Sequence, residues 1–190
     1  MLSQEQIYEI FEKTNAMLEG HFKLTSGKHS NRYFQCAQVL QHPQYCQQLC
    51  RELARRFADI EVETVIGPAM GGILVSYELA RALGVRSLFA ERENGEMKLR
   101  RGFSIKPGEK VIVAEDVITT GGSVKEVMEV VKNLGGEVVG VGVLVNRSGG
   151  KADLGVPTEA LITTSVVTYE PDNCPLCQQG IPAVKPGSRS

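Results

Sequence analysis

Short apolar runs alternate with stretches of helical periodicity along most of the chain. The runs are apolar at consecutive positions, as in strands that are buried on both faces. The stretches between them place apolar residues three or four positions apart, which predicts amphipathic helices of about a dozen residues. The expected strands are residues 64–67, 87–90, 110–114 and 138–145, and the expected helices are residues 72–83 and 123–134. This alternation predicts an α/β fold with an open, mainly parallel sheet and helices on both faces.

The N-terminal part follows a different pattern. A helix is expected over residues 3–18 and ended by Gly20, because its apolar positions share one face and Ser3 and Gln6 have capping-box spacing. A strand, a glycine turn and a polar loop are expected over residues 21–30, a further strand over residues 32–39, and a second helix from Pro43. We predict one domain, residues 1–190, with an N-terminal extension (1–40), a core sheet (60–165) and an irregular C-terminal tail (172–190).

Composition and charge narrow the class of protein. The 190 residues carry 21 lysines and arginines against 22 aspartates and glutamates, a formal charge of −1. This balance argues against a nucleic-acid binder, whose affinity would need a basic face. The longest apolar run, residues 138–145, is too short to cross a membrane, and the first ten residues lack the pattern of a secretory signal. We therefore expect a cytoplasmic protein that binds neither nucleic acid nor membranes.

Five cysteines suit a reducing compartment better than a disulfide framework. Cys46 and Cys50 lie four residues apart in an expected helix and are interpreted as buried apolar residues. Cys174 and Cys177 have the spacing of half a zinc site or of a redox pair, but the sequence offers no second CxxC and no spaced histidine pair to complete a zinc site. We favour a structural or incidental role for this pair and leave a metal role open.

The chemistry is expected where the third core strand ends, because ligands of open parallel sheets bind at the carboxyl ends of the strands. Two acids, Glu115 and Asp116, follow the strand, and the hydroxyl- and glycine-rich residues 119–123 lead into a helix. Such a helix start binds phosphate, while the acids suit hydroxyl groups or a cation, so a ribose 5-phosphate fits. Neither a P-loop nor a G-x-G-x-x-G turn is present. The plainer alternative is that Thr119 caps the helix and the acids form surface ion pairs.

The segment Val-Ala-Glu-Asp-Val-Ile-Thr-Thr-Gly-Gly-Ser resembles the phosphoribosyl diphosphate (PRPP) motif of type I phosphoribosyltransferases. Further similarity, to the orotate-specific branch of this family, lies at Ser26–Ser30, Tyr33-Phe34, Gly67-Pro68-Ala69, Asn146-Arg147-Ser148 and the final Cys-Pro-Leu-Cys. The resemblance implies transfer of the 5-phosphoribosyl group from PRPP to orotate, which gives orotidine 5′-monophosphate and pyrophosphate in pyrimidine biosynthesis. It also implies Mg²⁺ as cofactor, held mainly through PRPP oxygens without direct protein ligands.

The resemblance assigns roles to individual positions. The first 40 residues would form a small hood over the base. The orotate-binding residues would be Thr119, Arg147, Tyr33 and Phe34. The PRPP-binding residues would be Glu115, Asp116, Val117, Ile118, Thr119, Thr120, Gly121, Gly122, Ser123, Gly71 and Gly72. A planar guanidinium at Arg147 suits the orotate carboxylate. The plainer alternatives are a surface arginine at Arg147 and core packing for the aromatic pair, above all for Phe34.

The charged loop of residues 91–107 matches the family's mobile catalytic loop, whose basic positions would here be Arg92, Lys98 and Arg100. In the family this loop reaches the neighbouring subunit, which implies a homodimer. The alternative is a solvated β-hairpin. The sequence departs from the family at Met70 and Gly71, where a tyrosine and a lysine are common, at Thr25, where a lysine is frequent, and in the loop, which has no histidine.

Two rival functions stay open on the sequence. One is a phosphoribosyltransferase for another base, which Arg147 and the Tyr33-Phe34 pair would distinguish from an orotate enzyme. The other is a PRPP-sensing regulator that binds nucleic acid, against which the near-neutral charge counts.

Overall fold

Six strands form the central sheet in a computed structural model that describes residues 1–24, 26–165 and 167–186. Their order is β5-β4-β3-β6-β7-β8, with all pairs parallel except β4–β5. The strands are β3 (Thr64–Pro68), β4 (Arg86–Glu93), β5 (Glu96–Leu99), β6 (Lys110–Ile118), β7 (Glu137–Asn146) and β8 (Thr158–Thr163). The predicted open, mainly parallel α/β sheet is confirmed.

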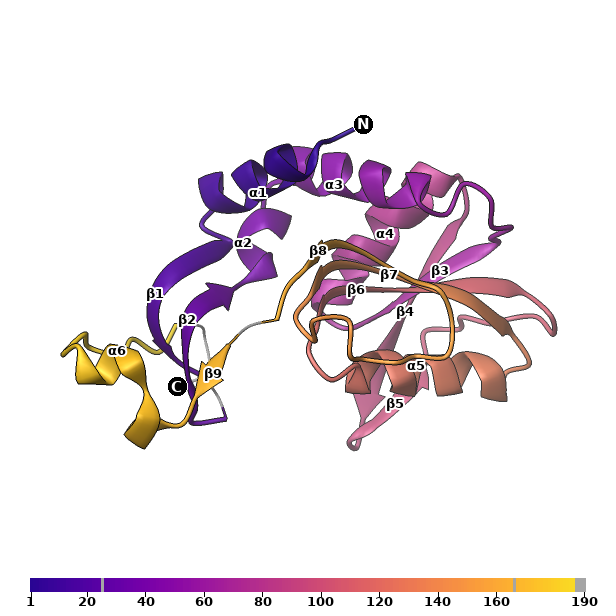
Figure 1. Ribbon diagram of the computed structural model, residues 1–190. Coiled ribbons are helices and arrows are strands. Elements are labelled where there is room, and N and C mark those ends of the chain that lie inside the picture. The colour runs from indigo at the N-terminus through magenta and orange to yellow at the C-terminus, as the bar shows by residue number, and fades with distance from the viewer. Residues whose placement is uncertain (25, 166, 187–190) are drawn as a thin grey trace.

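Helices cover both faces of this sheet (Figure 1). One face packs on α1 (Gln4–Lys13), α3 (Pro43–Arg55) and α4 (Gly71–Leu83), and the other packs on α5 (Gly122–Asn133). Along β6, alternate residues face the two cores: Ile112 and Ala114 face the first, whereas Val111 and Val113 face the second. Among the described residues, no helix is long and apolar enough to cross a membrane.

A smaller antiparallel sheet lies beside the central one and joins the two ends of the chain (Figure 1). Its strands, in the order β1-β2-β9, are β1 (Met17–Lys23), β2 (His29–Phe34) and β9 (Thr168–Tyr169). The short helix α2 (Cys36–Leu40) follows β2 and contacts the central sheet, because the Cys36 thiol donates to the Asp116 carbonyl at 3.5 Å. The small sheet is thereby held next to the carboxyl end of β6.

The N-terminal predictions are partly wrong. Ser3 and Gln6 do form a capping box, but α1 ends at Lys13 instead of Leu18. The Thr14 hydroxyl bonds to Ile10 O, and Asn15 adopts a left-handed conformation (φ 53°) that ends the helix, so Leu18 lies in β1.

The predicted strand over residues 32–39 ends early. β2 stops at Phe34 and α2 follows, because Cys36, Val39 and Leu40 are buried at helical spacing.

The C-terminal tail is more regular than predicted. A 3₁₀ turn, η1 (Pro171–Asn173), leads into α6 (Pro175–Gln178), and Val184 forms a parallel bridge with Phe22 of β1. Residues 187–190 of the predicted tail lie outside the described residues. The C-terminal segment, residues 167–186, is therefore tied to the small sheet by backbone hydrogen bonds.

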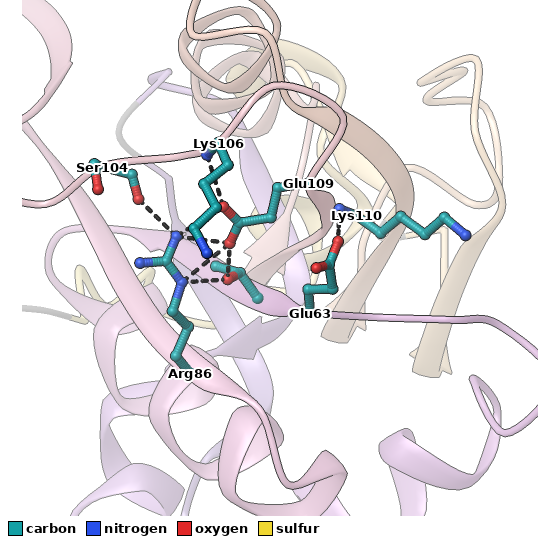
Figure 2. Close-up of polar contacts among 7 residues, drawn as sticks. Glu63, Arg86, Ser104, Lys106, Glu109 and Lys110 are labelled. Carbon is teal, nitrogen blue, oxygen red and sulfur yellow. Dashed lines mark hydrogen bonds and ion pairs between the residues drawn. The ribbon is translucent and has the colours of Figure 1, made fainter.

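A polar cluster joins the amino ends of β3, β4 and β6 (Figure 2). The Arg86 guanidinium donates to both oxygens of the Glu109 carboxylate at 2.6 and 2.9 Å, and its Nε donates to the Thr64 hydroxyl at 2.7 Å. Thr64 and the Lys106 backbone N–H also donate to Glu109. This buried carboxylate is thus fully partnered, at the edge of the sheet where ligands of such folds do not bind.

Candidate active site

A cavity of about 240 Å³ opens where β6 ends. Its walls are the end of β6, the turn that follows and the first part of α5, together with Arg92 of β4 and Glu126 of α5. The lining therefore includes Glu115, residues 117–123 and one predicted basic loop residue, whereas the predicted PRPP residues Asp116, Gly71 and Gly72 do not line it. Its position at the carboxyl ends of parallel strands is the one that the fold favours for a ligand.

The turn of residues 119–123 presents free backbone donors to this cavity. Gly121, not Thr119, is the N-cap of α5; it has a left-handed conformation (φ 81°), and no side chain within the described residues caps the helix. The N–H groups of the first turn are thus available to an anion, and Thr119, Thr120 and Ser123 are exposed beside them. The alternative in which Thr119 caps the helix is therefore wrong, and a phosphate-sized anion fits.

The acid doublet, Glu115 and Asp116, has no counter-ion among the described residues. Glu115 is only 8% exposed and Asp116 is half-buried, and neither acid forms an ion pair with any described residue, so the surface-ion-pair alternative is wrong as well. The Asp116 N–H donates to Glu115 at 3.1 Å, and the Val117 N–H donates to Asp116 at 2.8 Å. Burial, and then the charge of Asp116, raises the pKa of Glu115 to about 9, and burial also raises the pKa of Asp116. Hydroxyl donors or a cation would stabilise these carboxylates.

The glycine loop after β3 lies directly against the doublet. A Cβ atom on Gly71 would come within 2.5 Å of Asp116 Oδ2, and one on Gly72 would come within 2.7 Å of Pro68 and 3.2 Å of Glu115 Oε1. Only glycine permits this approach. Gly71 and Gly72 also begin α4, so the structure places a second helix N-terminus beside the acids, where the sequence predicted the diphosphate.

Arg147 lies just after β7, and its N–H donates to Ile118 O at 2.8 Å, which fixes it beside the end of β6. Its Nε is buried and has no hydrogen-bond partner among the described residues. Burial lowers the pKa of Arg147, while the nearby Tyr33 and Cys36 side chains raise it. A buried guanidinium donor without a partner indicates an acceptor that a ligand would supply.

The aromatic pair of β2 divides between two environments. Tyr33 is half-buried, packs on Phe22 at 5.8 Å between ring centroids and lies close enough to influence Arg147. Phe34 is 5% exposed and packs edge-on against Phe11 at 6.5 Å, so its side chain belongs to the core, as the plainer alternative held. A contact of the Phe34 backbone with orotate stays a prediction.

The three basic loop residues are not brought together. Arg92 lines the cavity and pairs with Glu126 at 2.8 Å. Lys98 and Arg100 do not line it; they pair with glutamates of the β4–β5 hairpin itself, Glu93 at 3.3 Å for Lys98 and at 3.0 Å for Arg100. This segment is the mixed-charge hairpin of the plainer alternative, and any role for these two residues in a neighbouring subunit's site stays a prediction. Thr25 lies outside the described residues.

Two residues of the site had not been expected. Glu126 forms a cavity wall one turn into α5; its spacing from Gly122 and Ser123 is the signal that could have identified it. Cys36 links the small sheet to Asp116 O, and no pattern in the sequence marks this contact.

Comparison with known proteins agrees with this geometry. Residues 35–160 match the model of the phosphoribosyl transferase domain. The chain is 78% identical over 188 residues to orotate phosphoribosyltransferase of Desulforamulus reducens, covering 99% of this chain and 98% of the relative. It is 71% identical to the enzyme of the same name from Pelotomaculum thermopropionicum, covering 99% of both chains.

A solved structure shows the same fold. The orotate phosphoribosyltransferase of Mycobacterium tuberculosis H37Rv superimposes with a TM-score of 0.68 at 22% identity, covering 83% of this chain and 95% of that one. Sequence match, fold and the position of the cavity agree, and the chain belongs to the phosphoribosyltransferase family, in its orotate phosphoribosyltransferase branch.

Proposed function

We propose that this cavity transfers the 5-phosphoribosyl group of PRPP to orotate, with release of orotidine 5′-monophosphate and pyrophosphate. Three features at the carboxyl end of β6 carry the proposal: the buried Nε of Arg147, the acid doublet and the start of α5. Among the described residues, this Nε has no hydrogen-bond partner and no side chain caps the helix. These three features are satisfied together by ligands that carry an acceptor for Arg147, hydroxyl groups for the acids and an anionic group for the helix start. Orotate and PRPP together supply these groups.

The ribose phosphate would occupy the cavity beyond β6. The N–H groups and hydroxyls of residues 119–123 would hold the 5-phosphate, and Glu115 and Asp116 would accept hydrogen bonds from the ribose hydroxyls. The N-terminus of α4 at Gly71 and Gly72 would face the diphosphate. Close backbone donors there would take over part of the role of the lysine that this chain lacks at Gly71.

The protein would act mainly by alignment and by stabilising charge. Arg147 would pair with the orotate carboxylate and orient the ring so that its nitrogen attacks C1 of the ribose as the bond to pyrophosphate breaks. Such positioning supplies about 7–11 kcal/mol in well-oriented systems. Negative charge grows on the leaving diphosphate, where the N–H groups of α4 and the Arg92 guanidinium could stabilise it. No side chain is needed as a nucleophile.

Magnesium fits the donors that are present. Carboxylate oxygens are ligands that Mg²⁺ accepts, but within the described residues no third carboxylate, histidine or cysteine lies close enough to the doublet to complete a metal-binding group. This favours an ion held mainly by diphosphate and ribose oxygens rather than by a protein cage. When bound, it supplies positive charge next to the leaving group.

A homodimer is supported by an apolar stripe on α4. Met70, Leu74 and Tyr77 recur at helical spacing and are 82%, 49% and 61% exposed. Such a row suits an interface with a second copy. Sedimentation should give a dimer, and Tyr77→Asp should give monomers with reduced activity. A matched change at exposed Leu134, Leu134→Asp, should preserve both the dimer and the activity; a wild-type monomer with full activity would contradict the proposal.

The five free cysteines support a cytoplasmic, reducing location.

The activity test uses purified full-length protein with PRPP, Mg²⁺ and one base at a time. We expect the ultraviolet absorbance of orotate to fall, with no comparable reaction of uracil, adenine or hypoxanthine. Omission of Mg²⁺ should abolish the reaction. Turnover of a base without a carboxylate at the orotate rate would contradict the role of Arg147.

A further inference from the structure

Two histidines and two cysteines from opposite ends of the chain meet at the small sheet. His21 lies on β1, His29 begins β2, Cys174 precedes α6 and Cys177 lies within it. One ring nitrogen of each histidine and the two sulfur atoms all lie within 4.8 Å of one another. We call these four residues the His–Cys cluster. It takes no part in the proposed phosphoribosyl transfer.

The distances in the cluster approach those of a tetrahedral metal site. Bonds of 2.0–2.1 Å to nitrogen and 2.3 Å to sulfur require ligand–ligand edges of about 3.3–3.8 Å. Cys174 Sγ lies 3.5 Å from His21 Nε2, and Cys177 Sγ lies 3.3 Å from His29 Nδ1 and 3.8 Å from His21 Nε2. The two ring nitrogens are closer, at 2.8 Å, so they would separate by about half an ångström on binding an ion.

A backbone contact sets the tautomer of His21. Its Nδ1 lies 2.7 Å from the Ile181 carbonyl, which can only accept, so Nδ1 carries the proton and donates it. Nε2 then holds a lone pair that faces His29 and the two sulfur atoms. Protein histidines that bind metals usually have this arrangement, in which the second nitrogen donates to a carbonyl or carboxylate.

Three of the four side chains in the cluster are buried, and the fourth is exposed to solvent. His21, His29 and Cys174 are 3%, 7% and 0% exposed, whereas Cys177 is exposed and leaves a route for an ion. Without an ion, the four side chains are joined only by the hydrogen bond between the two rings and by the longer contacts of the two free thiols with the ring nitrogens. The four possible metal ligands come from segments about 150 residues apart in the sequence. Neither the packing of the apolar core nor the proposed catalytic reaction requires them to lie together.

We propose that the His–Cys cluster is a structural Zn²⁺ site that fastens the C-terminal segment to the β1–β2 hairpin. Two thiolates and two imidazoles in a tetrahedron favour zinc, and four protein ligands leave no open position for catalysis. The backbone already brings these segments together: Val184 N–H donates to His21 O, and Lys23 N–H donates to Val184 O, both at 2.8 Å. The metal would lock this contact.

Metal content tests the proposal on full-length protein. Protein reconstituted with zinc and then desalted should retain about one equivalent per chain, and cobalt should give the charge-transfer absorption of thiolate ligands. Cys177→Ser, at the exposed ligand, and His29→Asn should each lower zinc affinity at least tenfold. Matched changes at the remaining histidine and at a cysteine of α3, His42→Asn and Cys46→Ser, should leave zinc binding unchanged.

A second readout separates a metal site from simple packing. A strong chelator should lower the melting temperature of the wild type and of the two matched controls but not that of Cys177→Ser. Retention of less than about a tenth of an equivalent by the reconstituted wild type would overturn the proposal. So would full zinc retention by Cys177→Ser, or a Cys174–Cys177 disulfide in protein purified under reducing conditions. None of these results depends on phosphoribosyl transfer.

Discussion

Each end of the central sheet holds a buried glutamate, and the two glutamates differ in their hydrogen-bond partners. At the amino ends of the strands, Glu109 is 4% exposed and is bound by Arg86, Thr64 and the Lys106 N–H (Figure 2). At the carboxyl ends, Glu115 is 8% exposed, and the described residues offer it one backbone N–H. The two carboxylates are therefore buried to a similar degree, but Glu109 has a full set of hydrogen-bond partners and Glu115 does not.

The pKa values follow this difference. Burial raises the pKa of Glu109, but hydrogen bonds from Lys106, Thr64 and Arg86 outweigh it and hold the pKa below its ordinary value. At Glu115, burial and the charge of Asp116 act together and raise the pKa to about 9. A completed polar cluster stabilises a fold, whereas an incomplete one marks a place where a ligand supplies the missing groups.

The largest effect on stability should come from removing the partner of Glu109. Arg86→Met leaves this carboxylate buried without its cation and should lower the free energy of unfolding by about 3 kcal/mol. Urea denaturation measures the loss, and Arg51→Met, at an exposed position of α3, is the control. Phosphoribosyl transfer by the folded variant should stay near the wild-type rate. A loss below about 1 kcal/mol would mean that the pair behaves like an ordinary surface ion pair.

Removal of Arg147 should affect function instead. Arg147→Ala deletes charge-assisted hydrogen bonds to the orotate carboxylate worth about 2 kcal/mol, so the orotate KM should rise about 30-fold. The PRPP KM and the free energy of unfolding should change little. Steady-state kinetics with each substrate varied in turn measures the difference, with Arg51→Ala as control. An unchanged orotate KM with a raised PRPP KM would contradict the assignment.

The pH dependence of stability should differ in sign at the two ends. Native Glu115 keeps its proton up to about pH 9, whereas the unfolded chain releases it near 4.5, so this residue makes stability fall as pH rises between these values. Glu115→Gln should flatten that fall. Native Glu109 releases its proton more readily than the unfolded chain, so its contribution is present above the unfolded pKa and is lost as pH falls through the lowered native pKa.

Urea denaturation from about pH 2 to pH 9 measures both slopes, because the Glu109 contribution is lost below the unfolded pKa of 4.5. Glu109→Gln should remove the loss of stability at acid pH and leave the alkaline slope unchanged. We expect the change caused by Glu109→Gln to be smaller than the losses caused by Arg86→Met and Arg147→Ala, because glutamine keeps most of the polar surface buried at this position. Identical pH profiles for the wild type and Glu115→Gln would show that the Glu115 carboxyl titrates alike in both states.

Local sequence patterns identified the central sheet and the turn of residues 119–123, because continuous apolar runs and a glycine-rich helix start each have one dominant structural outcome. Patterns failed where tertiary contacts decide the structure. The residue that ends α1, Asn15, is polar but adopts a left-handed conformation that the helical pattern does not show. α2 was mistaken for a strand because five residues are too few to separate the two periodicities.

At the candidate site too, local sequence patterns predicted some features and tertiary contacts decided the others. The acid doublet and the turn are contiguous in sequence and were predicted as one unit, and the structure shows the predicted glycines Gly71 and Gly72 packed against the acids. The burial of Arg147 and the pairing of Lys98 with its own hairpin depend on distant or flexible side chains. The cysteine pair looked incomplete because its partners, His21 and His29, are about 150 residues away and meet it only in the folded chain.

The most direct measurement is the affinity for PRPP with Mg²⁺ by isothermal titration calorimetry. We predict one site per chain in the wild type and in Asp59→Asn, which changes an exposed aspartate outside the cavity. Asp116→Asn should weaken binding at least tenfold, or about 1.4 kcal/mol, without loss of folding. Wild-type affinity in Asp116→Asn, or no binding heat in the folded wild type, would contradict the assignment of the acid doublet to the ribose.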